Sequence, residues 1–205
     1  MKGEERRMFS VTTTCNGESL LRSVSSPCVF DEQLKEDIKT LKDFCGSFEL
    51  YSISAIQLGI PKRMIYIKTT SSTTTNQLNE KDEERLYINP IILSKRGKTK
   101  YWEICVSCVD ENGIRYGSLV TRPYEIEIEY QNMAGGEVHE TLTGLAATIF
   151  CHEYDHLNGI LQMDRAEKNI MIALDDRWKL RKEEPYQIIS KDCEWEEPNI
   201  KEWHP

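Results

Sequence analysis

The chain lacks several features that would place it in common classes of protein. None of its apolar runs approaches the roughly 20 residues that a membrane-spanning helix needs. Residues 1–14 contain no long apolar core of the kind found in a secretory signal. Basic residues are in deficit, with 26 against 34 acidic residues and a formal net charge of −8. This balance argues against bulk attraction to nucleic acid or to an anionic membrane.

The 205-residue chain contains seven cysteines, but they do not have the regular spacing of a disulfide framework. The number is odd and the spacing irregular, so we expect a reducing compartment and free thiols. Histidine is scarce, with four residues, and two of them lie in the stretch 152–156. We expect the other two, His139 and His204, to be surface residues. The length allows one domain with a hydrophobic core.

The stretch 152–156 carries the clearest chemical signal. It follows residues 141–150, which contain no charge and predict a buried helix. His152 and His156 are four residues apart, so a helix places them on one face, where they can share a metal ion. Glu153 completes an H-E-x-x-H pattern, in which the glutamate is the general base toward water at the metal. The weaker alternative is a core helix with two hydrogen-bonded histidines.

A catalytic metal centre of this kind needs a third protein ligand and one open position. Cys105 and Cys108, near the end of a predicted strand, are the candidates. With the two histidines they could form a closed four-ligand structural zinc site, but that site would give Glu153 no role. We prefer Cys105 alone as the third ligand, because this leaves a position for water.

The remaining pattern predicts one α+β domain at residues 21–183, with a loop insertion at 69–85. We expect a polar tail at 1–20 and an acidic, tryptophan-containing tail at 184–205. Two helices are predicted, one at 31–45, capped by Asp31 and ended by Gly46, and one over about 170–182. Strands are predicted at 63–68, at 86–93 and from 98, and residues 124–130 and 137–143 are predicted to form a hairpin. Pro90 interrupts the strand at 86–93 and predicts an edge position.

Three motifs in this order resemble those of the peptide deformylase family. The first, G-x-G-x-[AS]-A-x-Q-x-G, corresponds to LYSISAIQLG at 50–59. The second, E-G-C-x-S, corresponds to EICVS at 103–107, and the third, H-E-x-D-H-L-x-G, is complete as HEYDHLNG at 152–159. The resemblance covers residues 20–164. It implies the deformylase fold, in which antiparallel strands surround a central metal-binding H-E-x-x-H helix.

The resemblance also implies an activity and the residues that carry it. The enzyme would remove the N-formyl group from the N-terminal formylmethionine of nascent proteins and release formate. One divalent ion, Fe²⁺ with Zn²⁺ as the alternative, would be held by Cys105, His152 and His156. Glu153 would move the proton, while the Gln57 amide and the backbone N–H of Val106 would stabilise the oxyanion. The implied substrate-binding residues are Ser54, Gly59, Ile104 and Arg115.

Three positions depart from the motifs, because Leu50, Ser52 and Ile104 replace glycines. A β-branched side chain at 104 resists positive φ, so Ile104 is expected to narrow the peptide groove or to shift the strand that carries Cys105. This leaves open a deformylase-like protein with lost or altered activity that acts as a binding or assembly component. An H-E-x-x-H zinc peptidase is a further alternative, although its third ligand would have to lie downstream, among His204, Asp164 and Glu167.

Partners and location follow from the same resemblance. We expect N-formylmethionyl peptides or nascent chains as substrates, with transient ribosome association and no direct binding of nucleic acid or membrane. Ser54-Ala55 in the first motif resembles mitochondrial and plastid members of the family. The expected location is therefore the matrix of a mitochondrion or another organelle, with a bacterial-type cytoplasm as the alternative.

Overall fold

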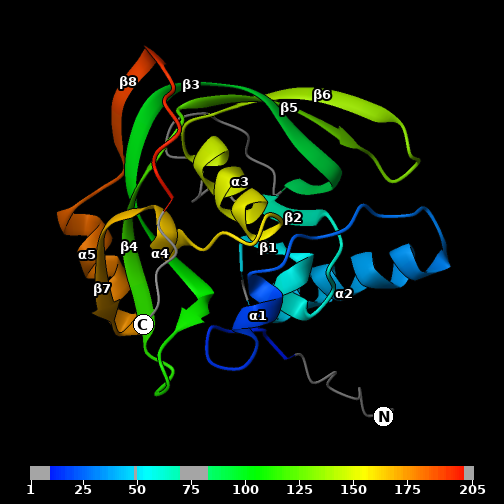
Figure 1. The fold of residues 1–205 in the computed structure, drawn as a ribbon, viewed down its shortest axis with the longest axis horizontal. Helices are drawn as coiled ribbons and strands as arrows, with labels where there is room; N and C mark the ends of the chain where they lie inside the picture. The colour runs from blue at the N-terminus through cyan, green and yellow to red at the C-terminus, as the bar shows by residue number, and fades with distance from the viewer. Residues whose placement is uncertain (1–9, 49, 70–82, 201–205) are drawn as a thin grey trace.

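The computed structural model describes residues 10–48, 50–69 and 83–200. Helix α3 (Gly144–His156) lies at the centre, and an antiparallel sheet bends around it (Figure 1). Among the described residues, no helix is both long enough and apolar enough to cross a bilayer. The α+β architecture with strands around the H-E-x-x-H helix is the one predicted from the motifs.

The sheet has eight strands, and five of them form the path β1-β2-β3-β4-β7. Strands β5 and β8 also pair with β3, and β6 pairs with β5. The strands are β1 (Ser52–Ser54), β2 (Met64–Thr69), β3 (Glu83–Val109), β4 (Arg115–Arg122), β5 (Glu125–Gln131), β6 (Glu137–Thr143), β7 (Ala166–Ile172) and β8 (Gln187–Glu194). The helices besides α3 are α1 (Glu18–Leu21), α2 (Glu32–Phe48), α4 (Gln162–Arg165), α5 (Arg177–Glu183) and the 3₁₀ turns η1 (Ala55–Leu58) and η2 (Leu174–Asp176).

Strand β3 is one continuous strand, so the prediction of separate strands at 86–93 and from 98 is wrong. Its pairing with β2 ends at Ile88, and beyond this residue β3 pairs with β5 alone until β8 and β4 join at Arg96 and Thr99. Pro90 therefore lies where one side of β3 has no partner strand among the described residues, which agrees with the predicted edge position. The chain accommodates this proline through Asn89, which takes a positive φ of 51°, and through a register shift between Ile88 and Ile91. Such an irregularity bends a strand without ending it. The predicted loop at 69–85 is also corrected at both ends, because Thr69 belongs to β2 and 83–85 belong to β3, while 70–82 lie outside the described residues.

Helix α2 begins as predicted but ends later. The carboxylate of Asp31 accepts the backbone N–H of Leu34 at 2.9 Å, which confirms the N-cap. Gly46 does not stop the helix, which continues to Phe48. The ring of Phe48 packs on Phe44 one turn earlier, with centroids 4.7 Å apart, and this contact favours the additional helical residues.

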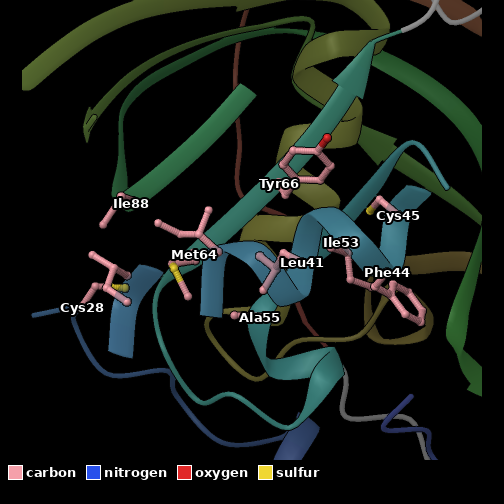
Figure 2. Packing of buried hydrophobic residues seen from close by; sticks show 11 residues of the cluster. Cys28, Leu41, Phe44, Cys45, Ile53, Ala55, Met64, Tyr66 and Ile88 are labelled. Carbon is pink, nitrogen blue, oxygen red and sulfur yellow. The ribbon is translucent and has the colours of Figure 1, made fainter. Parts of the chain in front are cut away.

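The buried face of α2 packs under β1 and β2 (Figure 2). Leu41 and Phe44 of the helix join Ile53 of β1 and Met64 and Tyr66 of β2 in one apolar cluster. A second cluster packs α3 against the sheet through Phe150, Cys151, Leu157, Ile126, Ile128 and Tyr87. These two clusters fix β1 and α3 relative to each other, and both elements carry residues of the candidate site.

The uncharged run at 141–150 is divided between two elements. Residues 141–143 complete β6, and the helix begins at Gly144, which has a φ of 62° that favours glycine. The predicted strand at 63–68 and the hairpin of 124–130 and 137–143 are confirmed to within one residue at each end.

Both predicted tails belong in part to the folded body. The backbone N–H groups of Thr12 and Thr14 donate to the carbonyls of Gln57 and Ser107, at 2.8 and 2.9 Å, and α1 follows them. Residues 1–9 lie outside the described part. At the other end, β8 pairs with β3, so residues 187–194 extend the sheet.

The predicted helix at 170–182 is wrong in its first half. Ile170 lies in β7, where it pairs with Gly117 of β4, and the helix α5 begins at Arg177. The helical spacing of Ile170, Leu174 and Trp178 does not indicate a strand at residue 170, because the edge of β4 with which β7 pairs exists only in the folded sheet.

Candidate metal centre

The second half of β3 and the last turns of α3 bring three donor atoms together. One ligand atom each from Cys105, His152 and His156 lies within 4.8 Å of the others, and the Cys105 Sγ to His156 Nε2 distance is 3.4 Å. The two imidazole centroids are 5.1 Å apart, as expected for residues one helical turn apart on one face. The residues predicted to hold the metal are therefore adjacent in the structure.

Cys105 lies in surroundings that favour a thiolate. The backbone N–H of Ser107 and the side-chain amide of Gln57 both donate to its Sγ, at 3.4 and 3.3 Å. A hydrogen bond from the Cys108 thiol holds the pKa of Cys105 well below its ordinary value, with help from His156 and against the effect of burial. The thiolate is the form of cysteine that binds metal.

Cys108 is not a fourth donor. The hydrogen bond to Cys105 and complete burial raise the pKa of Cys108 well above its ordinary value, so it remains a thiol. Among the described residues, the buried group of metal donors contains Cys105 and the two histidines without Cys108. This arrangement argues against the closed four-ligand zinc site.

The downstream carboxylates that a zinc peptidase could use are engaged elsewhere. Asp164 pairs with Arg22 and Glu167 with Lys100, the latter at 2.7 Å. His204 lies outside the described residues. The donor beside the two histidines is thus upstream of the motif, which disfavours the peptidase alternative.

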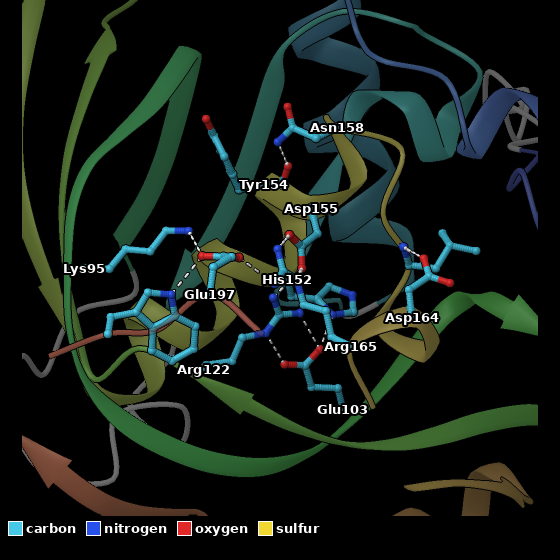
Figure 3. Close-up of polar contacts among 12 residues, drawn as sticks. Lys95, Glu103, Arg122, His152, Tyr154, Asp155, Asn158, Asp164, Arg165 and Glu197 are labelled. Carbon is cyan, nitrogen blue, oxygen red and sulfur yellow. Dashed lines mark hydrogen bonds and ion pairs between the residues drawn. The ribbon is translucent and has the colours of Figure 1, made fainter. Parts of the chain in front are cut away.

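A buried network of charges orients His152 (Figure 3). Its Nδ1 lies 2.8 Å from Glu103 Oε2 and donates to it, because a carboxylate can only accept. Glu103 also accepts two hydrogen bonds from Arg122, at 2.8 and 2.9 Å, and Arg122 and Arg165 both pair with Asp155. This fixes the tautomer of His152 so that Nε2 is left for a metal. Asp155, held by both arginines, anchors this network and is not among the metal donors of the described residues.

The same network holds Glu103 in its charged form. Burial would raise the pKa of this carboxyl, but Arg122 and His152 hold it at about 2. Burial likewise opposes protonation of His152, yet hydrogen bonds to Cys105 and Glu103 raise the pKa of His152 well above its ordinary value. The sequence motifs predict no site role for Glu103, Arg122 or Arg165. Alternation along the strand could have placed Glu103 beside Cys105, but nothing local indicates either arginine.

Glu153 lies beside the donors with one oxygen held. It is 2% exposed, and its Oε1 accepts the hydroxyl of Ser52 at 2.7 Å. Its Oε2 is buried and has no hydrogen-bond partner among the described residues. Burial raises the pKa of Glu153, against the opposing charges of His152 and His156. Three donors and an adjacent carboxylate are the parts of a metallohydrolase site.

The two residues predicted as oxyanion donors lie next to Cys105. The Nε2 of Gln57 is 3.0 Å from Ser107 Oγ in addition to its contact with Cys105, and its Oε1 accepts from the backbone and the hydroxyl of Ser54. Val106 is half-buried and follows Cys105 in β3. The position of both residues is compatible with the predicted role.

The residues predicted to bind substrate occupy different settings. Ser54 is fully buried and directed to Gln57, whereas Gly59 is exposed and ends η1 with a φ of 77°. Arg115 is half-buried at the start of β4, close enough to Cys105 for the thiolate charge to act on it. Ile104 is half-buried in β3 opposite Gly117.

The donor set fits a divalent transition metal. It offers one thiolate and two imidazoles, a combination that suits zinc or iron better than magnesium or calcium. His156 Nδ1 is buried without a partner among the described residues, as is Glu153 Oε2, so the site presents polar atoms that the rest of the described chain does not satisfy. A second group, Glu129, Glu137 and His139, is largely exposed, in agreement with the predicted surface position of His139.

Comparison with known proteins points to the same chemistry. The family profile described as polypeptide deformylase matches residues 12–170. The peptide deformylase of Rhizobium meliloti strain 1021 is 33% identical over 157 residues, which cover 74% of this chain and 82% of that protein. The one from Pelagibacter ubique is 34% identical over 152 residues, covering 73% and 81%.

Solved structures give the same result. The Thermotoga maritima peptide deformylase superposes with a TM-score of 0.65 at 28% identity and covers 80% of this chain and 100% of that one. The Synechococcus elongatus enzyme in complex with actinonin has a TM-score of 0.65 at 26% identity, with 88% of each chain covered. The chain belongs to the peptide deformylase family. It is a hydrolase that removes the N-formyl group from nascent peptides.

Proposed function

We propose that deformylation takes place at the centre formed by Cys105, His152 and His156, with Glu153 as the proton-transfer group and N-formylmethionyl peptides as substrates. The observation that carries this assignment is the three donor atoms within 4.8 Å of one another, beside a buried carboxylate with one unpartnered oxygen. A bound divalent ion supplies Lewis acidity, which activates water and polarises the formyl carbonyl.

The residues of the chain perform the proton transfers and stabilise the developing charge. Glu153 takes a proton from the attacking water through Oε2 and gives it to the departing amine nitrogen as the formyl C–N bond breaks. The Nε2 of Gln57 and the backbone N–H of Val106 donate to the oxygen of the tetrahedral species. The products are formate and a peptide with a free amino terminus.

The test is formate release from a formyl-Met peptide by protein loaded with iron under anaerobic conditions. The variant Glu153→Gln keeps the shape of the side chain but cannot accept the proton, so kcat should fall about 10²- to 10⁴-fold. Glu167→Gln, a change in an exposed ion pair remote from the donors, is the control and should retain activity. Absence of formate release by the loaded wild-type protein would overturn the assignment.

The proposed ion is Fe²⁺, with Zn²⁺ as the alternative. Both accept a thiolate and two imidazoles, so the donor set supports either one. Metal analysis of protein purified without added metal, together with deformylation rates after parallel loading with each ion, will distinguish them. A stoichiometric content of one metal ion per chain is expected.

We propose an organellar matrix, mitochondrial in the first instance, as the location of the protein, and a transient encounter with the ribosome as its route to nascent chains. Ser54-Ala55 in the first motif supports the location, and the substrate itself supports the encounter. Microscopy of the tagged full chain tests the first proposal. Co-sedimentation with translating ribosomes, compared with empty ribosomes, tests the second.

A further inference from the structure

Ser52 is the first residue of β1, and its hydroxyl reaches across to helix α3. Its Oγ donates to Glu153 Oε1 at 2.7 Å. Strand β1 is fixed on one side by pairing with β2, where Ser52 lies opposite Ile67, and on the other by packing against α3. The contact therefore joins two elements whose separation is set by the core, and it does not depend on a free loop.

The hydroxyl is placed to fix the orientation of the carboxylate. Glu153 is 2% exposed, and in the described part of the chain Ser52 provides the one hydrogen bond to it. The bond uses Oε1 and leaves Oε2 without a partner. A carboxylate with one oxygen held loses rotation about its terminal torsion, which is otherwise broad.

We propose that Ser52 is a positioning residue that holds Glu153 through Oε1 and directs Oε2 toward the reacting water. The proposal rests on the proposed role of Glu153. The corresponding position of the motif that this chain resembles is glycine, which has no group to make the contact. Ser52 therefore gives this chain a constraint on its proton-transfer group that a glycine could not provide.

The constraint predicts which kinetic constant changes. Ser52 contacts the carboxylate, so its removal should misplace the proton acceptor and leave peptide affinity intact. The variant Ser52→Ala should lower kcat about 10-fold, the factor that corresponds to one hydrogen bond to a charged group, with KM changed less than twofold. Ser52→Thr restores the hydroxyl and should recover most of kcat, whereas Ser52→Gly should behave like Ser52→Ala in kcat.

Ser94→Ala is the matched control. Ser94 Oγ also donates to a carboxylate, that of Glu127 at 2.9 Å, but this pair is exposed on the sheet far along β3 from Cys105. The kcat and KM of the Ser94→Ala variant should equal those of the wild type. A drop in kcat that Ser52→Thr does not recover, or a rise in KM alone, would overturn the positioning role.

A second readout does not use activity. In a double-mutant cycle of thermal unfolding midpoints, Ser52→Ala should lower the midpoint of the wild type and have little effect in a Glu153→Ala background. Additive shifts would overturn the proposed contact. If the shifts are non-additive but the loaded wild-type enzyme releases no formate, the proposed function fails, and the positioning role in proton transfer fails with it.

Discussion

At the scale of single residues, Ile104 shows how a departure from a motif can be absorbed. Alternation along β3 places its side chain on the opposite face from Glu103 and Cys105. A Cβ added to Gly117 would lie 3.8 Å from Ile104 Cγ1 and 3.4 Å from both Ile170 and Ile172, so these side chains share one face of the sheet. Because Ile104 takes no positive φ and lies opposite a glycine, β3 remains paired at this position.

The packing of Ile104 predicts an effect on stability rather than on substrate access. The variant Ile104→Ala removes half-buried apolar atoms from the face that Ile104 shares with Ile170 and Ile172, and should lower the free energy of unfolding by about 1–2 kcal/mol. The KM for a formyl-Met peptide should change less than twofold, because the lost atoms face away from the donors. Thermal unfolding and steady-state kinetics measure the two effects, with Ile91→Ala in the remote half of β3 as the control. A tenfold fall in KM would show that Ile104 obstructs the groove.

Glu103 is the residue through which the charge network reaches the donors. Glu103→Gln keeps the volume but removes the charge that faces Arg122, which is 2% exposed. Metal affinity should fall about 10- to 100-fold, because the amide is a weaker acceptor for His152 Nδ1 than the carboxylate and its one oxygen must also serve Arg122. Arg122 keeps its pair with Asp155 but loses the charge of Glu103, so the variant should also lose about 1–3 kcal/mol of unfolding free energy. Chelator competition and denaturant titration measure these effects, and unchanged metal retention would contradict the assigned role.

At the scale of elements, the exit from α3 depends on one glycine. Gly159 has a φ of 72°, and a Cβ at this position would overlap the backbone carbonyl of Arg22. The neighbouring Asn158 pairs with Val24, so the N-terminal segment passes directly over the end of the helix. Only a residue without a side chain allows this crossing beside the donors.

The variant Gly159→Ala should therefore lower the free energy of unfolding by more than backbone strain alone would. Gly113→Ala is the matched control, since Gly113 has a φ of 77° with open space around its Cβ position and should lose about 1–2 kcal/mol. Gly159→Ala should lose at least about 3 kcal/mol, because main-chain atoms must move as well. Equal losses in chemical denaturation would exclude the close crossing.

What sequence reasoning could recover at this scale depends on how local each signal is. The H-E-x-x-H turn, the cap at Asp31 and the hairpin are determined by residues close together in the sequence, and the structure contains all three. The continuity of β3 through Pro90, the strand at Ile170 and the pairing of β8 depend on partners distant in sequence. Arg122 belongs to the same class, because it reaches Glu103 only after β3 and β4 pair.

At the scale of the whole molecule, the C-terminal segment is tied back to the centre of the fold. Glu197 accepts hydrogen bonds from Lys95 of β3, from Trp195 and from Arg165, at 2.7, 2.8 and 2.8 Å (Figure 3). Arg165 in turn pairs with Asp155 of α3. One exposed carboxylate thus connects the segment after β8 with the helix that carries the histidines.

This connection should open in acid. Burial raises the pKa of Glu197, but the bonds from Lys95, Trp195 and Arg165 lower it from 4.5 to about 2. Because the folded pKa lies below the unfolded one, the stabilisation is fully present above about pH 4.5 and is lost as the pH falls toward about 2. Between these two pH values, Glu197 is protonated to a greater extent when the segment is detached than when it is docked. Lowering the pH therefore favours detachment of the segment.

The measurement is hydrogen exchange of the backbone at 187–197 as a function of pH, with intrinsic exchange rates subtracted. Protection in the wild type should decline between about pH 4.5 and 2, the interval set by the two pKa values of Glu197. Glu197→Gln should show reduced protection already at neutral pH and a flatter pH dependence. Glu196→Gln, which alters a neighbouring exposed carboxylate 3.9 Å from Lys98, should follow the wild type. If both variants follow the wild-type curve, β8 pairing alone holds the segment and the carboxylate does not contribute.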